Sequence, residues 1–476
     1  MPCRMPYVLC LCLLVLLPFF SGTAMSEIVS TLDDQESLAV TIYNQDLALI
    51  RDARKLSLQP GIQTLAFREV SAKIRPQTAL LAAPGLRVLE QNFEYDLLTP
   101  KALLEKYVGQ KVLLVKTHPT TGEEAEQEAT VLSNGNGTVL RVGDHIESGI
   151  PGRLIFPSVP ENLRDRPTLT MLVESKNSDP QPVVLSYLTR GLSWQADYVA
   201  ELGEDDTTLD LNGWVTLKNE SGATYENAQL KLVAGDVNRV QERRPQPVMR
   251  AMAFNAEGLS ESMAEESMFE YHLYTLARPT TIKEKQSKQV ALMQADNVQV
   301  KKEFILDGQN YYYSNKVGEL GKKIKVGVFV ELKNSKEAGI GQPLPAGIVR
   351  VYKKDSSGSL QFVGEDRIDH TPENETVRLK LGDAFDVTAD KKQTDFKKLA
   401  GFSRYHYIYE SAFEMVVKNA KEEAVTVQVQ EPVPGDWEIL EESAPHVKKN
   451  ASTAVWQIKV EPKSSTTLTW RVKVKY

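Results

Sequence analysis

Residues 209–219 read Leu-Asp-Leu-Asn-Gly-Trp-Val-Thr-Leu-Lys-Asn, and the order of apolar and polar side chains in this stretch decides the fold. Leu209, Leu211, Val215 and Leu217 stand at alternate positions, with mostly polar residues between them. A period of two is typical of a strand with one buried face, because successive side chains of a strand point to opposite faces. Similar short runs recur along the chain between Gly, Pro, Asn and Asp residues. The pattern therefore predicts an all-β protein built from antiparallel Ig-like β-sandwiches.

A strand ending in Lys-Asn appears three times. Segments 215–219, 330–334 and 416–419 each finish an apolar strand on this pair, and polar turn residues follow. Asn ends a strand readily because it tolerates the left-handed backbone and bonds to its own turn. This strand–Asn–turn–strand unit suits Ig-like sandwiches.

Residues 99–160 combine the one well-signalled short helix with a small inserted β-barrel. Thr99 is placed to cap a helix over 101–107, and Pro100 suits its first position. The Asn-Gly pairs of 134–137 supply the positive φ angles of a tight hairpin. The strands expected around this hairpin are 112–115, 129–132 and 139–142.

The first 24 residues have the features of a secretory signal peptide. Arg4 precedes an apolar run over 8–20, and small residues then lead to a cleavage site between Ala24 and Met25. The alternative, an uncleaved anchor, is disfavoured because about 20 apolar residues are needed to span a bilayer. All three cysteines lie inside this segment: Cys3, Cys10 and Cys12. We expect an exported chain without thiols or a transmembrane helix, in the periplasm or the extracellular or outer envelope.

The balance of charged residues bears on the class of partner. Lys and Arg total 56 against 63 Asp and Glu, and the resulting net charge of −7 argues against a nucleic-acid partner.

The expected domains are an N-terminal β domain at 25–98, the helix and barrel at 99–160, a central β-sandwich region at 161–240 and 269–400, a flexible Met-rich linker at 241–268, and C-terminal sandwich strands at 401–476.

Catalytic and metal-binding patterns are not recognisable in the sequence. The six histidines are far apart, and no phosphate-binding loop or nucleophile elbow is present. We therefore expect no catalytic, cofactor-binding or metal-binding residues. One alternative is a secreted hydrolase whose site is assembled from distant His and Asp/Glu residues, such as His406 with Glu410 or Glu414. Another is a surface adhesin, which predicts an exposed aromatic or apolar patch.

Tyrosines at alternate positions form the best candidate for a binding site. Tyr405, Tyr407 and Tyr409 share one face of a predicted strand, while His406 and Ile408 share the other. Exposed tyrosines offer an apolar ring and a polar tip, which suits stacking on sugars or gripping a peptide. The alternative is ordinary cross-strand aromatic packing inside a sheet.

Several segments carry a resemblance to a known family. The runs 185–198 (Leu-Ser-Tyr-Leu-Thr-Arg-Gly-Leu-Ser-Trp-Gln-Ala-Asp-Tyr) and 213–228 (Gly-Trp-Val-Thr-Leu-Lys-Asn-Glu-Ser-Gly-Ala-Thr-Tyr-Glu-Asn-Ala) are distinctive. With 416–437 and 470–476, they resemble bacterial proteins carrying the domain of unknown function 4139, including the mucoidy-inhibitor-A-like group. The resemblance implies a secreted or envelope-located β protein, and it supplies no catalytic residues.

Together these observations favour an exported, non-catalytic protein of the bacterial cell envelope with a binding or scaffolding role. Its partner would be a protein or glycan of the envelope, and no cofactor is expected. Strand edges and aromatic faces would then make the contacts.

Overall fold

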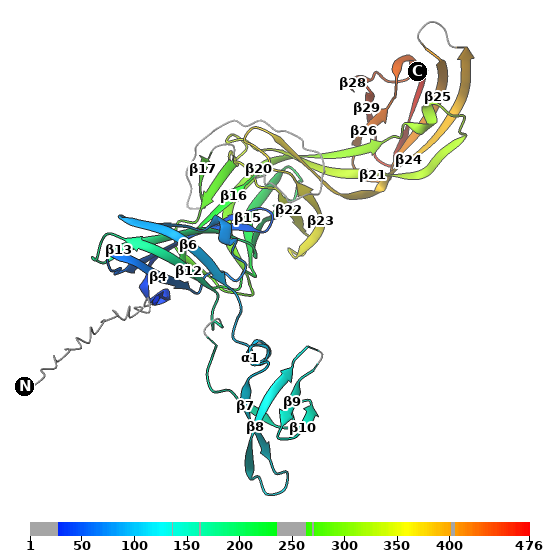
Figure 1. Cartoon of the computed structure of the whole chain (residues 1–476). Helices are drawn as coiled ribbons and strands as arrows, with labels where there is room; N and C mark the ends of the chain where they lie inside the picture. Colours follow the sequence, from blue (N-terminus) through cyan, green and yellow to red (C-terminus); the bar gives the residue numbers. More distant parts are fainter. Residues whose placement is uncertain (1–26, 136, 161–162, 236–262, 269–270, 401–404) are drawn as a thin grey trace, which may run out of the picture. The chain divides into compact units, whose positions relative to one another are not determined.

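A computed structural model describes residues 27–135, 137–160, 163–235, 263–268, 271–400 and 405–476 (Figure 1). Strands account for 65% of the structure and helices for 4%, which confirms the all-β class. The predicted signal peptide, with Ala24 and Met25, lies outside the described residues, as does 241–262 of the predicted Met-rich linker. Of that linker, the structure places the strand β17 (Ala264–Met268).

The chain divides into two compact units. The first comprises 27–36, Ala53–Val70 and Leu80–Leu185, and the second comprises Ser37–Asp52, Ser71–Ala79 and Ser186–Tyr476. The division passes within three strands: β2 (Gln35–Tyr43), β3 (Leu47–Leu56) and β13 (Gln181–Thr189). Short elements near these borders are η1 (Leu32–Asp34), η2 (Pro76–Thr78) and β5 (Leu80–Ala82).

Two sheets build the first unit. The order in the four-stranded sheet is β1 (Glu27–Ser30), β4 (Gly61–Arg68), β12 (Thr168–Ser175) and β6 (Leu86–Glu94). The order in the five-stranded sheet is β10 (His145–Ser148), β9 (Val139–Val142), β8 (Glu124–Ser133), β7 (Lys111–Thr117) and β11 (Arg153–Ile155).

The five-stranded sheet corrects the prediction of a small β-barrel. The expected pairings of β7 with β8 and of β8 with β9 are present, but the sheet is open, with β10 and β11 at its edges. The first five residues of β8, Glu-Ala-Glu-Gln-Glu, are exposed, so they cannot line a barrel interior. A helix, α1 (Pro100–Lys106), packs Leu104 into the core of the sheet instead. The Thr99 side chain accepts a hydrogen bond from the Ala102 amide at 3.1 Å, which confirms the predicted cap.

The second unit contains a sheet in which β16 is central. This strand pairs in parallel with β2 and antiparallel with β18 and β19. The bounds are β16 (Tyr225–Ala234), β18 (Tyr271–Thr275) and β19 (Thr280–Ile282), and β17 pairs with β18.

A thirteen-stranded sheet forms the rest of the second unit. Its main order is β23 (Leu360–Ile368), β22 (Gly347–Lys354), β14 (Leu192–Leu202), β15 (Thr208–Asn219), β20 (Gln286–Asp307), β21 (Glu319–Lys333), β24 (Thr376–Ala400), β25 (Tyr407–Asn419), β30 (Ser464–Lys475) and β27 (Asp436–Glu442). Off this path lie β26 (Val425–Pro432), β29 (Thr453–Val460) and β28 (Val447–Asn450), and the short helix η3 (Tyr311–Tyr313) precedes β21. The pairs β14–β22 and β20–β26 are parallel, so the sheets are mixed rather than purely antiparallel.

Two long strands each pair with different neighbours along their length. Along β20, residues 286–299 pair with β15 and residues 300–305 pair with β21. Along β24, residues 376–392 pair with β21 and residues 387–400 pair with β25 (Figure 1). Tryptophans, a phenylalanine and many valines from β24–β30 form one hydrophobic core beside the end of β20.

The Lys-Asn strand endings have a clear structural basis. Asn219 is fully buried, accepts a hydrogen bond from the Ser221 amide at 3.0 Å and donates one to the Ala223 carbonyl at 2.8 Å. Asn419 repeats both contacts, with the Lys421 amide at 3.0 Å and the Glu423 carbonyl at 2.7 Å. In these two endings the amide side chain ties the strand end to its own turn. The Asn334 amide donates instead to the Gln342 and Pro372 carbonyls, at 2.8 and 2.9 Å.

Candidate functional site

The three predicted tyrosines lie at the start of β25. Tyr407 is 50% exposed, Tyr409 is half-buried, and Tyr405 is half-buried just before the strand. Ile408, on the opposite face, is only 2% exposed. The strand alternation is therefore as expected, with the tyrosine face partly open to solvent and the Ile408 face covered.

Neighbouring aromatic residues extend this row into a surface that we call the aromatic stripe. The Tyr407 and Tyr409 rings are 6.3 Å apart and inclined by 17°, and Phe396 of β24 stacks on Tyr409 at 5.7 Å. Tyr476 meets the edge of Tyr409 at 5.8 Å. The stripe thus consists of Phe396, Tyr405, Tyr407, Tyr409 and Tyr476. Aromatic pairs at these distances attract one another by about 0.5–1.5 kcal/mol, which favours these ring orientations.

Charged groups border the aromatic stripe. The ammonium of Lys398 lies 4.8 Å from the centre of the Tyr407 ring, and that of Lys475 lies 5.9 Å from the Tyr405 ring. The Tyr405 hydroxyl donates a hydrogen bond to the Asp436 carboxylate. The stripe therefore combines flat apolar faces with cations and hydroxyls at its margin.

The stripe is continuous with the hydrophobic core. Phe413 stands on the same face of β25 as Tyr409, four residues further along, and is 1% exposed. Its ring stacks on Trp470 at 5.1 Å. The tyrosines are thus the outer end of a row of core aromatics, in which Tyr409 packs across the sheet and Tyr407 faces solvent. Ligand binding by these tyrosines stays a prediction.

A buried ion pair lies inside the same core. Lys391 of β24 and Glu431 of β26 are joined at 2.6 Å, and their side chains are only 4% and 0% exposed. The hydroxyls of Tyr312 and Tyr313 donate to the second carboxylate oxygen at 2.5 and 2.8 Å. The Lys391 ammonium also lies 4.0 Å from the Tyr312 ring centre. All these groups are satisfied by one another, as a buried charge requires.

Burial dominates the electrostatics of this cluster. It lowers the pKa of Lys391, and the Glu431 carboxylate opposes that shift without cancelling it. Burial, followed by the negative charge of Glu431, raises the pKa of Tyr313. Because solvent does not reach the two charged groups, the cluster acts as an internal tie between β24, β26 and η3.

Sequence reasoning missed this pair, although a signal was present. Val425, Val427 and Val429 are buried on one face of β26, and Glu431 follows in the same alternation. Lys391 follows Val387 and Ala389 in the same way on β24. A charged residue that continues the alternate spacing of buried residues is itself expected to be buried. Two such residues of opposite sign would have predicted the ion pair between Lys391 and Glu431.

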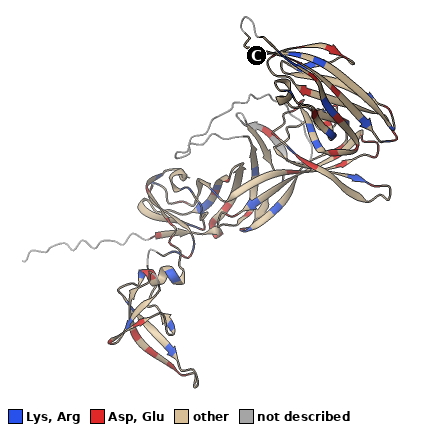
Figure 2. Ribbon diagram, turned by 90° about the vertical axis from the view of Figure 1, so that its right-hand side faces the viewer, with Lys and Arg blue, Asp and Glu red and all other residues tan. Residues whose placement is uncertain are grey.

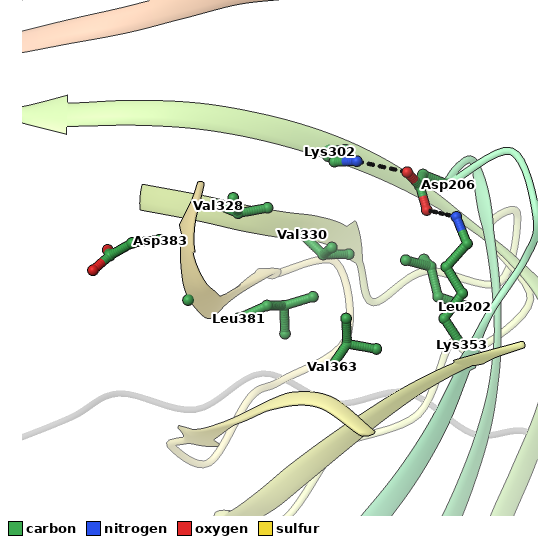
Figure 3. A pocket seen from close by; sticks show the side chains of 10 residues that line it. Leu202, Asp206, Lys302, Val328, Val330, Lys353, Val363, Leu381 and Asp383 are labelled. Carbon is green, nitrogen blue, oxygen red and sulfur yellow. Dashed lines mark hydrogen bonds and ion pairs between the residues drawn. The ribbon is translucent and has the colours of Figure 1, made fainter. Parts of the chain in front are cut away.

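A pocket of about 260 Å³ is a second candidate site, also within the second unit. Figure 3 shows Asp206, Lys302 and Lys353 at one end, Asp383 at the other, and aliphatic side chains between them. Lys302 donates to one Asp206 oxygen at 2.6 Å, and Lys353 donates to the other oxygen and to the Glu204 carbonyl at 2.9 Å. The aliphatic residues are Leu202, Val328, Val330, Val363 and Leu381.

The hairpin between β14 and β15 positions Asp206. The Asp205 carboxylate accepts hydrogen bonds from the Thr207 amide at 3.1 Å and from the Thr207 hydroxyl at 2.6 Å. Asp206 adopts φ of 59°, a conformation that Asp tolerates better than most residues. Burial would raise the pKa of Asp206, but hydrogen bonds from Lys302 and Lys353 outweigh it, and the pKa is lowered.

Histidines and acids are arranged differently from the hydrolase alternative. His406 is exposed, Glu410 pairs with Lys473 at 3.5 Å, and Glu414 pairs with Lys392 at 2.7 Å. One His–Glu contact in the described residues joins His446 to Glu442 at 2.9 Å. The four-residue spacing of these two was the only sequence signal for it. Across the described ranges, no group of three or more His, Cys, Asp or Glu residues is arranged to hold a metal ion.

Charged residues of both signs are distributed along the strands that the structure describes. Figure 2 shows Lys and Arg interleaved with Asp and Glu along the strands of both units. In the part of the chain that the structure describes, no helix combines the length and apolar character needed to cross a membrane.

The site and fold define an all-β protein with a surface aromatic stripe, a polar-ended pocket and a sealed ion pair. Comparison with known families then identifies the group: the chain belongs to the family described as "Domain of unknown function (DUF4139)", whose sequence model matches residues 183–476. This confirms the resemblance noted in the sequence.

One curated protein shows a local similarity. Nuclear anchorage protein 1 of Caenorhabditis elegans is 27% identical over 191 residues, which cover 38% of this chain and 2% of that protein. The chain thus corresponds to a very small part of that protein's length.

Proposed function

We propose that this protein is an exported, non-catalytic binding protein of the bacterial cell envelope, and that the aromatic stripe is its glycan-binding surface. The observation that carries the proposal is the half-exposed Tyr407 ring, held nearly parallel to Tyr409 beside the Lys398 ammonium. A fixed ring with a polar tip is suited to stack on a sugar while its hydroxyl and a nearby cation bind polar groups.

Export is supported by the first 24 residues, where a basic start, an apolar run and a small-residue exit follow one another. The test is expression of the full chain in a bacterium, cell fractionation and N-terminal sequencing. A protein in the envelope fraction beginning at Met25 is expected, and a cytoplasmic protein beginning at Met1 would contradict export.

The non-catalytic assignment is supported by the state of the candidate acids. Glu410 and Glu414 are each engaged by a lysine, and Glu431 is sealed in the core. None of these carboxylates stands beside His406 in a cleft, as the hydrolase alternative requires.

Glycan binding is tested by cosedimentation of the chain from Met25 onward with purified peptidoglycan sacculi. Loss of a stacking ring worth about 0.5–1.5 kcal/mol predicts binding about two- to ten-fold weaker for Tyr407→Ala. Tyr95→Ala removes another exposed tyrosine, 73% exposed and outside the stripe, and is the matched control. No sedimentation with sacculi, or equal losses in the two variants, would refute the proposal.

A further inference from the structure

The pocket between β14, β20, β21, β22, β23 and β24 has the chemistry of a ligand site that is separate from the aromatic stripe. We propose that it binds an amphipathic monocarboxylate, a medium-chain aliphatic acid whose carboxylate meets Lys302 and Lys353. The proposal is independent of glycan binding and of export.

The charge at the polar end favours an anion. Two ammonium groups face one carboxylate there, so Lys302, Lys353 and Asp206 together carry a formal excess of one positive charge. The side chains are 30%, 29% and 20% exposed, so they are partly shielded from water yet reachable. At the opposite end the Asp383 charge is balanced by Lys380 at 3.6 Å.

The two lysines at the polar end of the pocket have N–H groups left to donate to a ligand. An ammonium has three donors. Within the described residues, Lys302 gives one hydrogen bond, to Asp206, and Lys353 gives two, to Asp206 and the Glu204 carbonyl. The remaining N–H groups can donate to both oxygens of a ligand carboxylate, and such charge-assisted bonds are stronger than neutral ones.

The wall of the pocket favours an aliphatic body. Val328 and Val330 stand on the same face of β21, and Leu381 and Val363 complete the apolar middle. Val363 is 43% exposed, so part of its apolar surface is open to a ligand. Figure 3 shows these four side chains lying between the charged ends.

The size of the pocket sets the length of the ligand. A cavity of roughly 150 Å³ holds benzene, so 260 Å³ accommodates about ten non-hydrogen atoms. Octanoate has this size. A longer chain would extend past Asp383 into solvent, and a shorter one would leave apolar wall uncovered.

Isothermal titration calorimetry of the full chain with butanoate, hexanoate and octanoate tests the proposal. Saturable binding of one octanoate per chain is expected, tightening about four-fold for each added methylene. Lys302→Met and Lys353→Met should each weaken octanoate binding about ten-fold or more, since a hydrogen bond to a charged group is lost. Lys301→Met is the matched control, because Lys301 lies next to Lys302 on β20, is 72% exposed and pairs with Glu303.

A cationic ligand and a pocket-filling variant distinguish the contribution of charge to octanoate binding from that of apolar contacts. Octylamine should bind far more weakly than octanoate, and Val363→Trp should abolish octanoate binding by filling the apolar middle. Circular dichroism of each variant shows whether it is folded. Equal binding of octylamine and octanoate, no saturable binding, or unchanged affinity in the folded lysine variants would overturn the proposal. So would binding of a peptide ending in leucine when octanoate does not bind, since the site would then recognise a peptide terminus.

Discussion

Removing Lys391 should destabilise the second unit far more than removing its neighbour Lys392. Lys391→Met leaves Glu431, which is 0% exposed, without its ammonium partner at 2.6 Å. Breaking a buried pair in this way costs about 3–5 kcal/mol. Glu431 keeps the hydroxyls of Tyr312 and Tyr313 at 2.5 and 2.8 Å, which places the expected cost near 3 kcal/mol, the lower end of that range.

The assay is equilibrium unfolding in urea followed by tryptophan fluorescence, because Trp456 and Trp470 lie in the same core as the pair. At a slope of about 3 kcal/mol per molar urea, a loss of about 3 kcal/mol lowers the midpoint by about 1 M. Lys392→Met removes a surface pair with Glu414, whose side chains are 51% and 32% exposed, and should cost less than about 1 kcal/mol.

A double variant tests whether Lys391 and Glu431 stabilise the fold through their contact with each other. Glu431→Gln should also destabilise, since the buried ammonium then faces a neutral amide. The double variant Lys391→Met with Glu431→Gln should lose less than the sum of the two single changes, by about 0.5–3 kcal/mol. A Lys391→Met midpoint equal to that of Lys392→Met, or strictly additive single changes, would refute the reasoning.

Three further outcomes are expected. Asn219→Ala removes two side-chain hydrogen bonds, to the Ala223 and Ile282 carbonyls, and should cost about 2–3 kcal/mol in urea unfolding. Asn450→Ala, at an exposed strand end, should cost under about 1 kcal/mol, and similar losses in the two variants would count against the strand-end role of Asn219. Gly308→Ala places a methyl group 2.3 Å from the pinned Glu431 carboxylate and should lower stability by about 1–3 kcal/mol, while Gly318→Ala, with nothing within 4 Å, should be neutral in thermal melts. The pKa of Asp197 is lowered because hydrogen bonds from Thr216 and Arg350 outweigh the opposing effect of burial, so its stabilisation is present above its unfolded value of 3.8 and is lost as the pH falls through the folded value. Asp197→Asn should therefore be less stable at pH 7 and lose less stability as the pH falls below about 5, and an acid profile that matches the original chain would contradict this assignment.

Much of the strand content was predictable, because half-buried strands impose an alternating pattern. The burial of β15 follows that alternation along its whole length, with Leu209, Leu211, Val215 and Leu217 inside. The helix α1 was equally predictable, since Thr99 and Pro100 act locally. Local signals of this kind do not depend on the rest of the chain.

Topology was less accessible from the sequence. The parallel pairing of β14 with β22 joins segments about 150 residues apart, and no local pattern selects one distant partner over another. Barrel closure failed as a prediction for a related reason: it depends on strand number and stagger, which turn signals do not encode. The far end of β24 carries exposed charges, among them Lys397 and Lys398, so its apolar run indicated only a short strand.

Site residues were predictable only where they share a strand. Tyr407 and Tyr409 were recognised because they stand two positions apart, whereas Phe396 and Tyr476 join them through pairing with other strands. The pocket brings together lysines from β20 and β22 around a hairpin aspartate, and that arrangement exists only after folding.

The length of β24 has a mechanical consequence. Its 25 residues correspond to about 80 Å of extended backbone, at about 3.3 Å per residue, and they pair first with β21 and then with β25. Tension along this strand is therefore resisted by many ladder hydrogen bonds loaded in shear rather than opened one at a time. If a protease cut β24 near its middle, the covalent connection along the strand would be lost. Tension would then be carried only by the pairing of each half with β21 or β25.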